Sequence, residues 1–263
     1  MSVENMQSTV SKTLLIPLAA RASEMERSNP VVRDEKAADI IAQIDTGNMV
    51  VDGGEIVTLG ILARTKVIDD EVKKMLSHNP DMAILNLGAG LDTRISRLDN
   101  GRLRCFELDL PDVIDLRRKF FAENERVHFI PASVLDDAWI QELAGIRGDN
   151  LIIITEGLLM YFPENDVRQI FRLLATHFPG AHMFFDVVHS FFVGKTISST
   201  FLWGLDRAKD VESLNPSIRL MRSWSTGDLL KERQSFFFRM MNVLPSTRNR
   251  SQILHIQFDD GVK

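Results

Sequence analysis

The residues best suited to chemistry in this sequence form a glycine-rich corner, where an apolar run leads into two closely spaced glycines. The segment 83–94 is AILNLGAGLDTR, and its apolar start at 83–87 is typical of a buried parallel strand. Gly88 and Gly90 have no Cβ atom, so a ligand can lie against the main chain at the start of the following helix. The corner therefore predicts a ligand-binding turn between a strand and a helix.

Carboxylates follow the corner at a spacing that suits a nucleoside. The segment 103–109, LRCFELD, predicts a second strand that ends in Glu107 and Asp109. An acidic residue about 20 positions beyond the glycines can accept hydrogen bonds from the two hydroxyls of a ribose. Thr93 stands where the dinucleotide fingerprint has its third glycine, which weakens the case for NAD. S-adenosylmethionine fits because it carries a ribose and an adenine but no phosphate; an NAD-dependent oxidoreductase stays as the alternative.

Arg64 lies in the apolar stripe of a predicted helix, between Ile61 and Ile68. An arginine on a buried face must find an anion, because an unpaired buried charge costs several kcal/mol. Two interpretations stay open. The guanidinium pairs with a carboxylate of the core or extends to the edge of the stripe. Alternatively, its planar fork grips the carboxylate of a cofactor.

Polar residues also follow the predicted strands 151–155 and 182–188. Glu156 ends the first, where a carboxylate is costly unless it meets a cation, either the amino group of a cofactor or a buried base. Tyr161, the only tyrosine, is a candidate for orienting a substrate or for aromatic packing. His189 follows the second strand and is a candidate general base or a structural histidine.

Composition narrows the classes of partner. The chain has 263 residues and a formal charge of −5, so it shows no positive footprint for nucleic acid or an anionic membrane. The single cysteine, Cys105, allows no intrachain disulfide and favours a reducing, cytoplasmic compartment. No apolar run approaches the roughly 18 to 20 residues of a membrane-spanning helix. The histidines show no spacing that suggests zinc, so we expect no metal and a small-molecule partner.

The order of predicted elements places the candidate residues at one edge of a sheet. Alternating strands and helices are typical of an α/β fold with a doubly wound, mostly parallel, Rossmann-like sheet, here expected to have seven strands. The final apolar runs, Phe236–Met241 and Ile253–Phe258, predict an antiparallel sheet edge. One structural domain is expected in four parts: a helical N-terminal segment (1–80), a cofactor-binding α/β core (81–189), a cap insertion (190–235) and C-terminal edge strands (236–263).

The expected cap is rich in large apolar residues, among them Phe191, Phe192, Trp203 and Trp224. Such residues are ordinarily core. Because the segment follows the fifth predicted strand, it is also placed to form a lid over the ligand cleft at the strand ends. An apolar lid suits a flat or hydrophobic acceptor.

Three motifs together resemble a known family. They are NLGAGLDTR at 86–94, FELDLP at 106–111 and EGLLMYFP at 156–163. In this order and spacing they resemble the leucine carboxyl methyltransferase family, which includes the tetracenomycin-type polyketide O-methyltransferases. The resemblance runs from about Thr13 to Val188 and implies a class I S-adenosylmethionine-dependent methyltransferase.

The resemblance also implies roles for individual residues. Matched to the family, Arg64 would hold the cofactor carboxylate, Gly88 and Gly90 would line its methionine part, Asp109 would bind the ribose, Ser133 and Val134 would flank the adenine, and Glu156 would lie beside the amino group. Arg21 matches a family arginine that binds the cofactor, with an ordinary surface charge as the alternative.

These observations predict an S-adenosylmethionine-dependent O-methyltransferase that acts on a carboxylate or phenolic oxygen of a small molecule. Acidic acceptors are favoured because no general base is evident in the sequence, and a neutral alcohol would need one. A protein that binds S-adenosylmethionine without catalysis, as a scaffold or sensor, is a further alternative.

Overall fold

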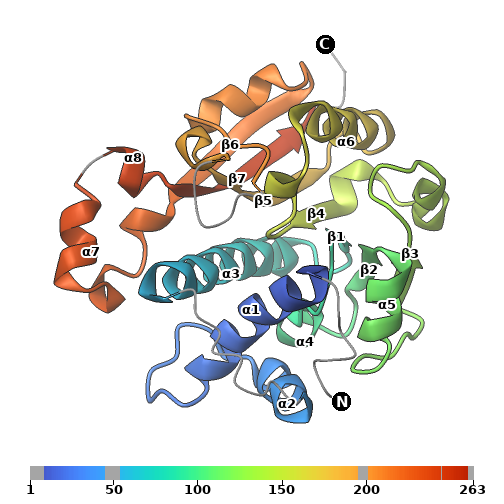
Figure 1. The fold of residues 1–263 in the computed structure, drawn as a ribbon. Helices are drawn as coiled ribbons and strands as arrows, with labels where there is room; N and C mark the ends of the chain where they lie inside the picture. Colours follow the sequence, from blue (N-terminus) through green and yellow to red (C-terminus); the bar gives the residue numbers. More distant parts are fainter. Residues whose placement is uncertain (1–8, 45–53, 195–200, 244, 260–263) are drawn as a thin grey trace.

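The computed structural model describes residues 9–44, 54–194, 201–243 and 245–259 (Figure 1). Its centre is a seven-stranded sheet with the order β3-β2-β1-β4-β5-β7-β6. The first five strands run parallel, and β7 is antiparallel to both β5 and β6. The strands are β1 (Ala83–Leu87), β2 (Arg104–Asp109), β3 (Val127–Pro131), β4 (Leu151–Thr155), β5 (His182–Val188), β6 (Ile218–Ser225) and β7 (Ser251–Phe258). The predicted fold class is confirmed.

The strand order changes direction at β1. The chain moves from β1 to β2 and β3 on one side, and then returns to β4 and β5 on the other. In open α/β sheets, ligands bind outside the carboxyl ends of the strands at such a switch point. The glycine corner follows β1 directly, so it lies at this position.

Helices cover both faces of the sheet. Ile152 and Ile154 pack towards α3, whereas Ile153 packs with α6 on the other face, because side chains of a strand alternate between faces. Figure 1 shows α3 and α6 on opposite sides of the strands. The α-helices are α1 (Thr9–Glu24), α2 (Glu35–Gln43), α3 (Gly54–His78), α4 (Arg94–Leu98), α5 (Pro111–Arg117), α6 (Glu164–His177), α7 (Phe236–Met241) and α8 (Pro245–Arg248).

The N-terminal helices α1 and α2 pack beside the glycine corner. A separate apolar cluster joins them to the corner, with Leu15 and Leu18 of α1 and Ile40 of α2 against Leu91. Asp34 caps the start of α2, because its Oδ1 accepts from the N–H of Ala37 at 3.0 Å. The N-terminal segment is therefore part of the wall around the predicted site.

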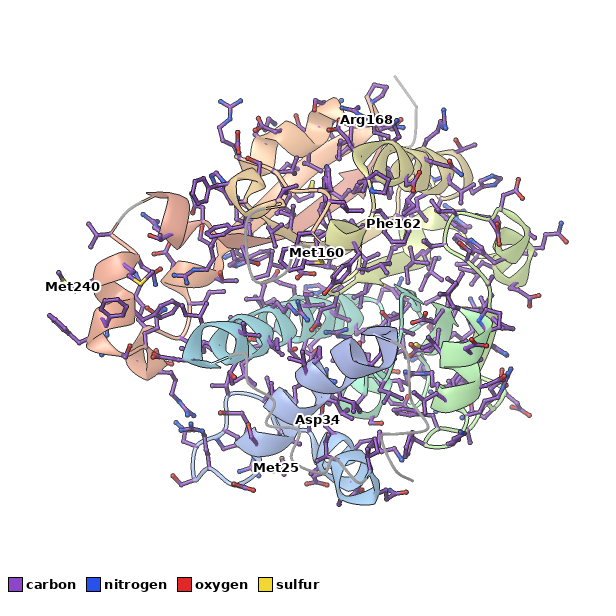
Figure 2. All side chains as sticks on the ribbon, viewed as in Figure 1. Met25, Asp34, Met160, Phe162, Arg168 and Met240 are labelled. Carbon is purple, nitrogen blue, oxygen red and sulfur yellow. The ribbon has the colours of Figure 1, made fainter. Side chains whose placement is uncertain are left out.

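One predicted strand is wrong. Residues Phe236–Met241 form α7, whose first turn is capped by Ser235 Oγ. Figure 2 shows Met240 of α7 projecting away from the molecule, and only Phe238 of this helix is buried. The partner of β7 is instead β6, inside the segment expected to be the cap. The strand predicted at Ile253–Phe258 lies within β7 and is confirmed.

The apolar residues of the expected cap do not share one environment. Trp203 is 3% exposed and belongs to the main core, and Trp224 packs against the core beneath α3. Phe191, by contrast, is 57% exposed. Trp203 therefore packs in the core and Trp224 is partly buried against it, while the lid role of the segment stays a prediction. Residues 195–200 lie outside the described part of the chain, and the four-part division stays a prediction.

Candidate active site

Both glycines of the corner adopt left-handed backbone angles. The φ values are +70° for Gly88 and +48° for Gly90, a region that other residues rarely adopt. A Cβ on Gly88 would lie 2.7 Å from Leu158 Cδ1, and one on Gly90 would lie 2.7 Å from Leu14 Cδ2. Glycine is therefore required at both positions, and the side chains of Leu14 and Leu158 lie over the corner.

Asp109 is hydrogen-bonded to the glycine corner. Its Oδ2 accepts from the main-chain N–H of Gly90 at 2.7 Å, and its Oδ1 accepts from the N–H of Leu110 at 2.7 Å. Burial raises the pKa of Asp109 above its ordinary value, although these two hydrogen bonds oppose that effect. Each carboxylate oxygen has lone pairs for about two bonds, so both can accept a second donor such as a ribose hydroxyl.

Glu107, the other acid of this strand, is structural. It is 1% exposed, and its Oε2 accepts from Asn86 Nδ2 at 2.9 Å. Its Oε1 lies 3.2 Å from Nη2 of Arg117, which is fully buried. Arg117 Nη1 also donates to the carbonyl of Gly90 at 3.0 Å. The sequence did not identify Arg117, because a base late in a helix is also explained by the helix dipole.

Arg64 forms two ion pairs across the carboxyl ends of β4 and β5. Its Nε donates to Glu156 Oε1 at 2.9 Å and its Nη1 donates to Asp186 Oδ2 at 2.8 Å. Burial acts to lower the pKa of Arg64, but attraction to Asp186 and Glu156 raises it above the ordinary value. The described structure thus contains the core ion pair that the sequence left open for Arg64.

Glu156 is shared between two arginines. Besides Arg64, it accepts from Arg94 Nη2 at 2.5 Å through Oε2. Burial alone would raise its pKa, yet the charges of Arg94 and Arg64 lower the pKa of Glu156 to about 2. Glu156 is therefore a carboxylate at neutral pH and can accept a further cation.

Arg94 extends these contacts into a charged network. It donates to Asp69 Oδ1 at 2.7 Å and to Asp92 Oδ2 at 2.5 Å. Arg97 then connects Asp69 to Asp34, which Figure 2 shows beside α1 and α2. The charged network comprises Arg21, Arg64, Arg94, Arg97, Asp34, Asp69, Asp92, Glu156 and Asp186. Its five carboxylates outnumber its four arginines, so its formal charge is −1.

Arg21 is not a surface charge. It is 2% exposed, and its Nε donates to Asp34 Oδ2 at 2.8 Å. The alternative of an ordinary surface residue is therefore wrong. Because Arg21 is engaged by Asp34 in the described structure, direct contact with a cofactor stays a prediction.

Ser133 and Val134 follow β3, beside the end of β2. The N–H of Ala132 donates to the carbonyl of Asp109 at 2.9 Å, which brings the two strand ends together. Val134 is 6% exposed, and Ser133 Oγ accepts from the N–H of Leu135 at 3.2 Å. Their predicted contact with an adenine stays a prediction, and their position next to Asp109 is consistent with it.

Tyr161 and His189 lie at the ends of β4 and β5. Tyr161 is 40% exposed and contacts Phe201 edge to face at 5.5 Å, and burial raises the pKa of its hydroxyl. His189 Nδ1 accepts from the N–H of Phe191 at 3.1 Å. That bond requires an unprotonated Nδ1, so Nε2 carries the proton in the neutral ring, and Nδ1 also lies 3.6 Å from Asp206 Oδ1. Catalytic roles for both residues stay predictions.

Outside the glycine corner, the described residues show few features of a further site. Among the residues that the structure describes, no group of three or more histidine, cysteine or acidic side chains is arranged to hold a metal ion. No helix in the described ranges is long and apolar enough to cross a membrane. A cavity of about 590 Å³ lies between α2 and α3, where Asp34, Asp69 and Arg97 of the charged network line it.

Comparison with solved structures supports the fold. A protein from Thermobifida fusca assigned as a methyltransferase superposes with a TM-score of 0.56 and 16% identity, over 77% of this chain and 82% of that one. An S-adenosylmethionine-dependent methyltransferase from Anabaena variabilis gives a TM-score of 0.52 and 14% identity, over 74% and 84% of the two chains. At such identities the likeness shows the architecture alone.

Sequence comparison shows the family. Residues 15–175 match the model of the leucine carboxyl methyltransferase family. The chain is 28% identical over 228 residues to the tetracenomycin polyketide synthesis O-methyltransferase TcmP of Streptomyces glaucescens, covering 83% of this chain and 84% of that protein. It is 27% identical over 237 residues to the S-adenosyl-L-methionine-dependent methyltransferase dpfgK of Gibberella zeae, covering 79% of each. The chain therefore belongs to the leucine carboxyl methyltransferase family of S-adenosylmethionine-dependent methyltransferases, as its three motifs predict.

Proposed function

We propose that this protein transfers a methyl group from S-adenosylmethionine to a carboxylate or phenolic oxygen of a small molecule. The observation that carries the proposal is the position of the Arg64–Glu156 pair between the glycine corner and the ends of β4 and β5. One cation and one anion, side by side, are complementary to the carboxylate and amino groups of the cofactor.

The residues present fit the cofactor. Arg64 would hold its carboxylate and Glu156 its amino group, while Asp109 would accept from the ribose hydroxyls. Gly88 and Gly90 would line the methionine part, and Ser133 and Val134 would flank the adenine. The formal charge of −1 on the charged network also suits a ligand that carries a positive sulfonium.

The same corner disfavours a dinucleotide. In dinucleotide-binding enzymes, free N–H groups at the start of the helix bind the pyrophosphate. Here Asp92 Oδ1 accepts from the N–H of Arg94 at 3.0 Å, so the chain's own carboxylate takes that place. Two phosphate charges would also meet Asp92 and Asp109, which supports S-adenosylmethionine over NAD.

Bound S-adenosylmethionine supplies a methyl group on a positively charged sulfur, which is reactive towards an oxygen nucleophile. The protein's task is then to place the acceptor oxygen in line with the methyl group, at about 3 to 3.5 Å. A carboxylate is already ionised at neutral pH and needs no base. For a phenol, His189 is the candidate general base, and its unprotonated nitrogen in the described arrangement is Nδ1.

The acceptor is proposed to lie between Tyr161 and the chain that follows β5. The N–H of Leu202 donates to the carbonyl of Met160 at 2.8 Å, which fastens this chain beside Tyr161. Phe191 and Leu202 are 57% and 53% exposed, so they offer apolar surface next to the strand ends. Such a surface suits a flat or hydrophobic acceptor better than a highly charged one.

Two experiments test the proposed function. Calorimetric titration with S-adenosylhomocysteine is expected to show binding, and a parallel titration with NADH is expected to show none. Incubation with methyl-labelled cofactor and a panel of aromatic acids, phenols and C-terminal peptides should then label an acid or a phenol. A methyl ester is lost in base and a phenol ether is not, which separates the two acceptors. Cofactor binding without any labelled acceptor would favour the non-catalytic scaffold.

A further inference from the structure

We propose that Asp186 is a positioning residue, which holds Arg64 in place when the Arg64–Glu156 pair opens to admit the amino-acid part of the cofactor. This inference rests on the proposed cofactor site. The described structure shows Arg64 and Glu156 bonded to each other, at 2.9 Å. For Arg64 to hold the cofactor carboxylate bidentately through Nε and Nη2 while Nη1 keeps Asp186, and for Glu156 to bind the amino group, this bond must be replaced by bonds to the ligand.

Asp186 is built to stay in position during that exchange. It is 2% exposed and lies in β5, where it pairs with Ile253 of β7. Its Oδ1 accepts from the N–H of Gly157 at 2.6 Å, which fixes the carboxylate, while its Oδ2 accepts from Arg64 Nη1 at 2.8 Å. A buried carboxylate held by a strand and a main-chain donor has little freedom to follow a ligand.

Gly157 lies against the guanidinium of Arg64. Its φ of +70° is a left-handed value, and a Cβ there would lie 3.1 Å from Arg64 Nη2. The absent side chain thus lets the guanidinium lie flat against the turn that follows β4. Asp186 and Gly157 therefore both contact the guanidinium of Arg64 and help to fix its position.

The exchange leaves no charge unpaired. When the Arg64–Glu156 bond opens, Arg64 keeps Asp186 and Glu156 keeps Arg94. The ligand's carboxylate and ammonium then take the two vacated positions, so each buried charge still has a partner. This matters because an uncompensated buried charge costs several kcal/mol.

The role of Asp186 depends on which part of the ligand is present. S-adenosylhomocysteine has the amino-acid part and requires the Arg64–Glu156 pair to open. 5′-Methylthioadenosine has the same adenosine and a thioether but no amino-acid part, so the pair stays closed when it binds. Without Asp186, Arg64 has Glu156 as its remaining carboxylate partner and resists opening. Loss of Asp186 should therefore weaken the binding of S-adenosylhomocysteine and leave the binding of 5′-methylthioadenosine nearly unchanged.

The test is calorimetric titration of the wild type and of Asp186→Asn with both ligands. We expect the substitution to lower the affinity for S-adenosylhomocysteine by about 10- to 100-fold, the range for losing a hydrogen bond to a charged group. We expect 5′-methylthioadenosine to change by less than about threefold. Asp81→Asn is the matched control, because Asp81 pairs with Arg102 at an exposed position just before the amino end of β1, whereas the proposed site lies at the carboxyl ends of the strands. The affinity for neither ligand should change.

The outcomes separate this inference from the proposed function. If a folded Asp186→Asn variant loses affinity for both ligands equally, Asp186 acts only on general structure. If its affinity for S-adenosylhomocysteine is unchanged, Arg64 needs no anchor. Either result overturns the inference. A wild type that binds neither ligand would instead refute the cofactor site, and the inference with it. If Asp186→Asn does not fold, Asp186→Glu, which keeps the charge but displaces it, should show a smaller loss confined to S-adenosylhomocysteine.

Discussion

Arg64 forms the core ion pair that the sequence allowed for it, and its proposed contact with the cofactor is compatible with that pair. A buried arginine requires an anion, and that requirement alone predicted a partner such as Glu156. Asp186 could not be predicted as the second partner, because it is 122 residues away and reaches Arg64 only through the order β4-β5 of the sheet. Local pattern shows that a charge needs a partner, whereas topology decides which one.

Arg94 illustrates the same limit at a residue inside a recognised motif. Its motif identified the family but did not reveal that Arg94 connects Asp69, Asp92 and Glu156. The helix that carries it has only five residues, too short for a periodic pattern to show which side is buried.

At the scale of single residues, Arg64→Ala and Asp109→Ala should each make the binding free energy of S-adenosylhomocysteine less favourable by about 1 to 3 kcal/mol. This is the range for losing a partner of a charged hydrogen bond. Calorimetry on folded variants measures this directly. Arg102→Ala is the control, since Arg102 forms an exposed ion pair with Asp81 and exposed pairs contribute little. Full wild-type affinity in Arg64→Ala or Asp109→Ala would assign that residue a structural role only.

At the scale of elements, continuous apolar runs predicted the buried strands and failed at the sheet edge. Leu151–Thr155 is buried at every position, so its apolar run was easy to recognise. Edge strand β6 has the sequence IRLMRSWS and is exposed at several positions, so it lacks that signal. The run FFFRMM has it but forms α7, where Phe236 and Phe237 are 79% and 73% exposed. Composition therefore misplaced one strand while the architecture stayed right.

The glycine corner gives a prediction at this scale. Gly88→Ala combines a left-handed φ of +70° with a clash against Leu158, whereas Gly101→Ala has a φ of +80° with open space around it. Both variants should lose about 1 kcal/mol of unfolding free energy or somewhat more, because alanine is strained at such angles. Only Gly88→Ala should also lower the affinity for S-adenosylhomocysteine, by about tenfold, because the added methyl group displaces Leu158. Urea unfolding and calorimetry separate the two effects; equal affinities in both variants would contradict a binding role for the corner.

At the scale of the whole molecule, the site is assembled from segments far apart in the chain. Asp34 comes from the N-terminal part, Arg94 from the corner and Asp186 from β5, and ion pairs connect all three through the charged network. The overall charge of −5 gave no hint of this arrangement, because the network nearly balances within itself. Net charge limits the partners of a protein, but the position of its paired charges is a property of the fold.

Stability against acid is a whole-molecule property that depends on a histidine pair at the other end of the sheet. His255 of β7 stacks on Phe184 with a centroid distance of 4.2 Å, and its Nε2 lies 2.9 Å from Nδ1 of His182. Burial lowers the pKa of His255 to about 4, and the charges of His182 and Arg222 act in the same direction. The ordinary value of about 6.5 applies to the unfolded chain, so between pH 6.5 and 4 the unfolded chain binds more protons.

The sign of the effect follows from this difference. The free energy of unfolding is unaffected by His255 above about pH 6.5 and falls as the pH drops towards 4, by up to about 2 kcal/mol at pH 5. Urea unfolding of the wild type at pH 7.5 and pH 5.0 should show this loss, and His255→Gln should reduce it. His78→Gln, which replaces a histidine at an exposed position away from this pair, serves as the control. Glu156 does not confuse the comparison, because its pKa of about 2 makes its contribution fall only below about pH 4.5. A wild type equally stable at both pH values would show that His255 is protonated in the folded protein without cost.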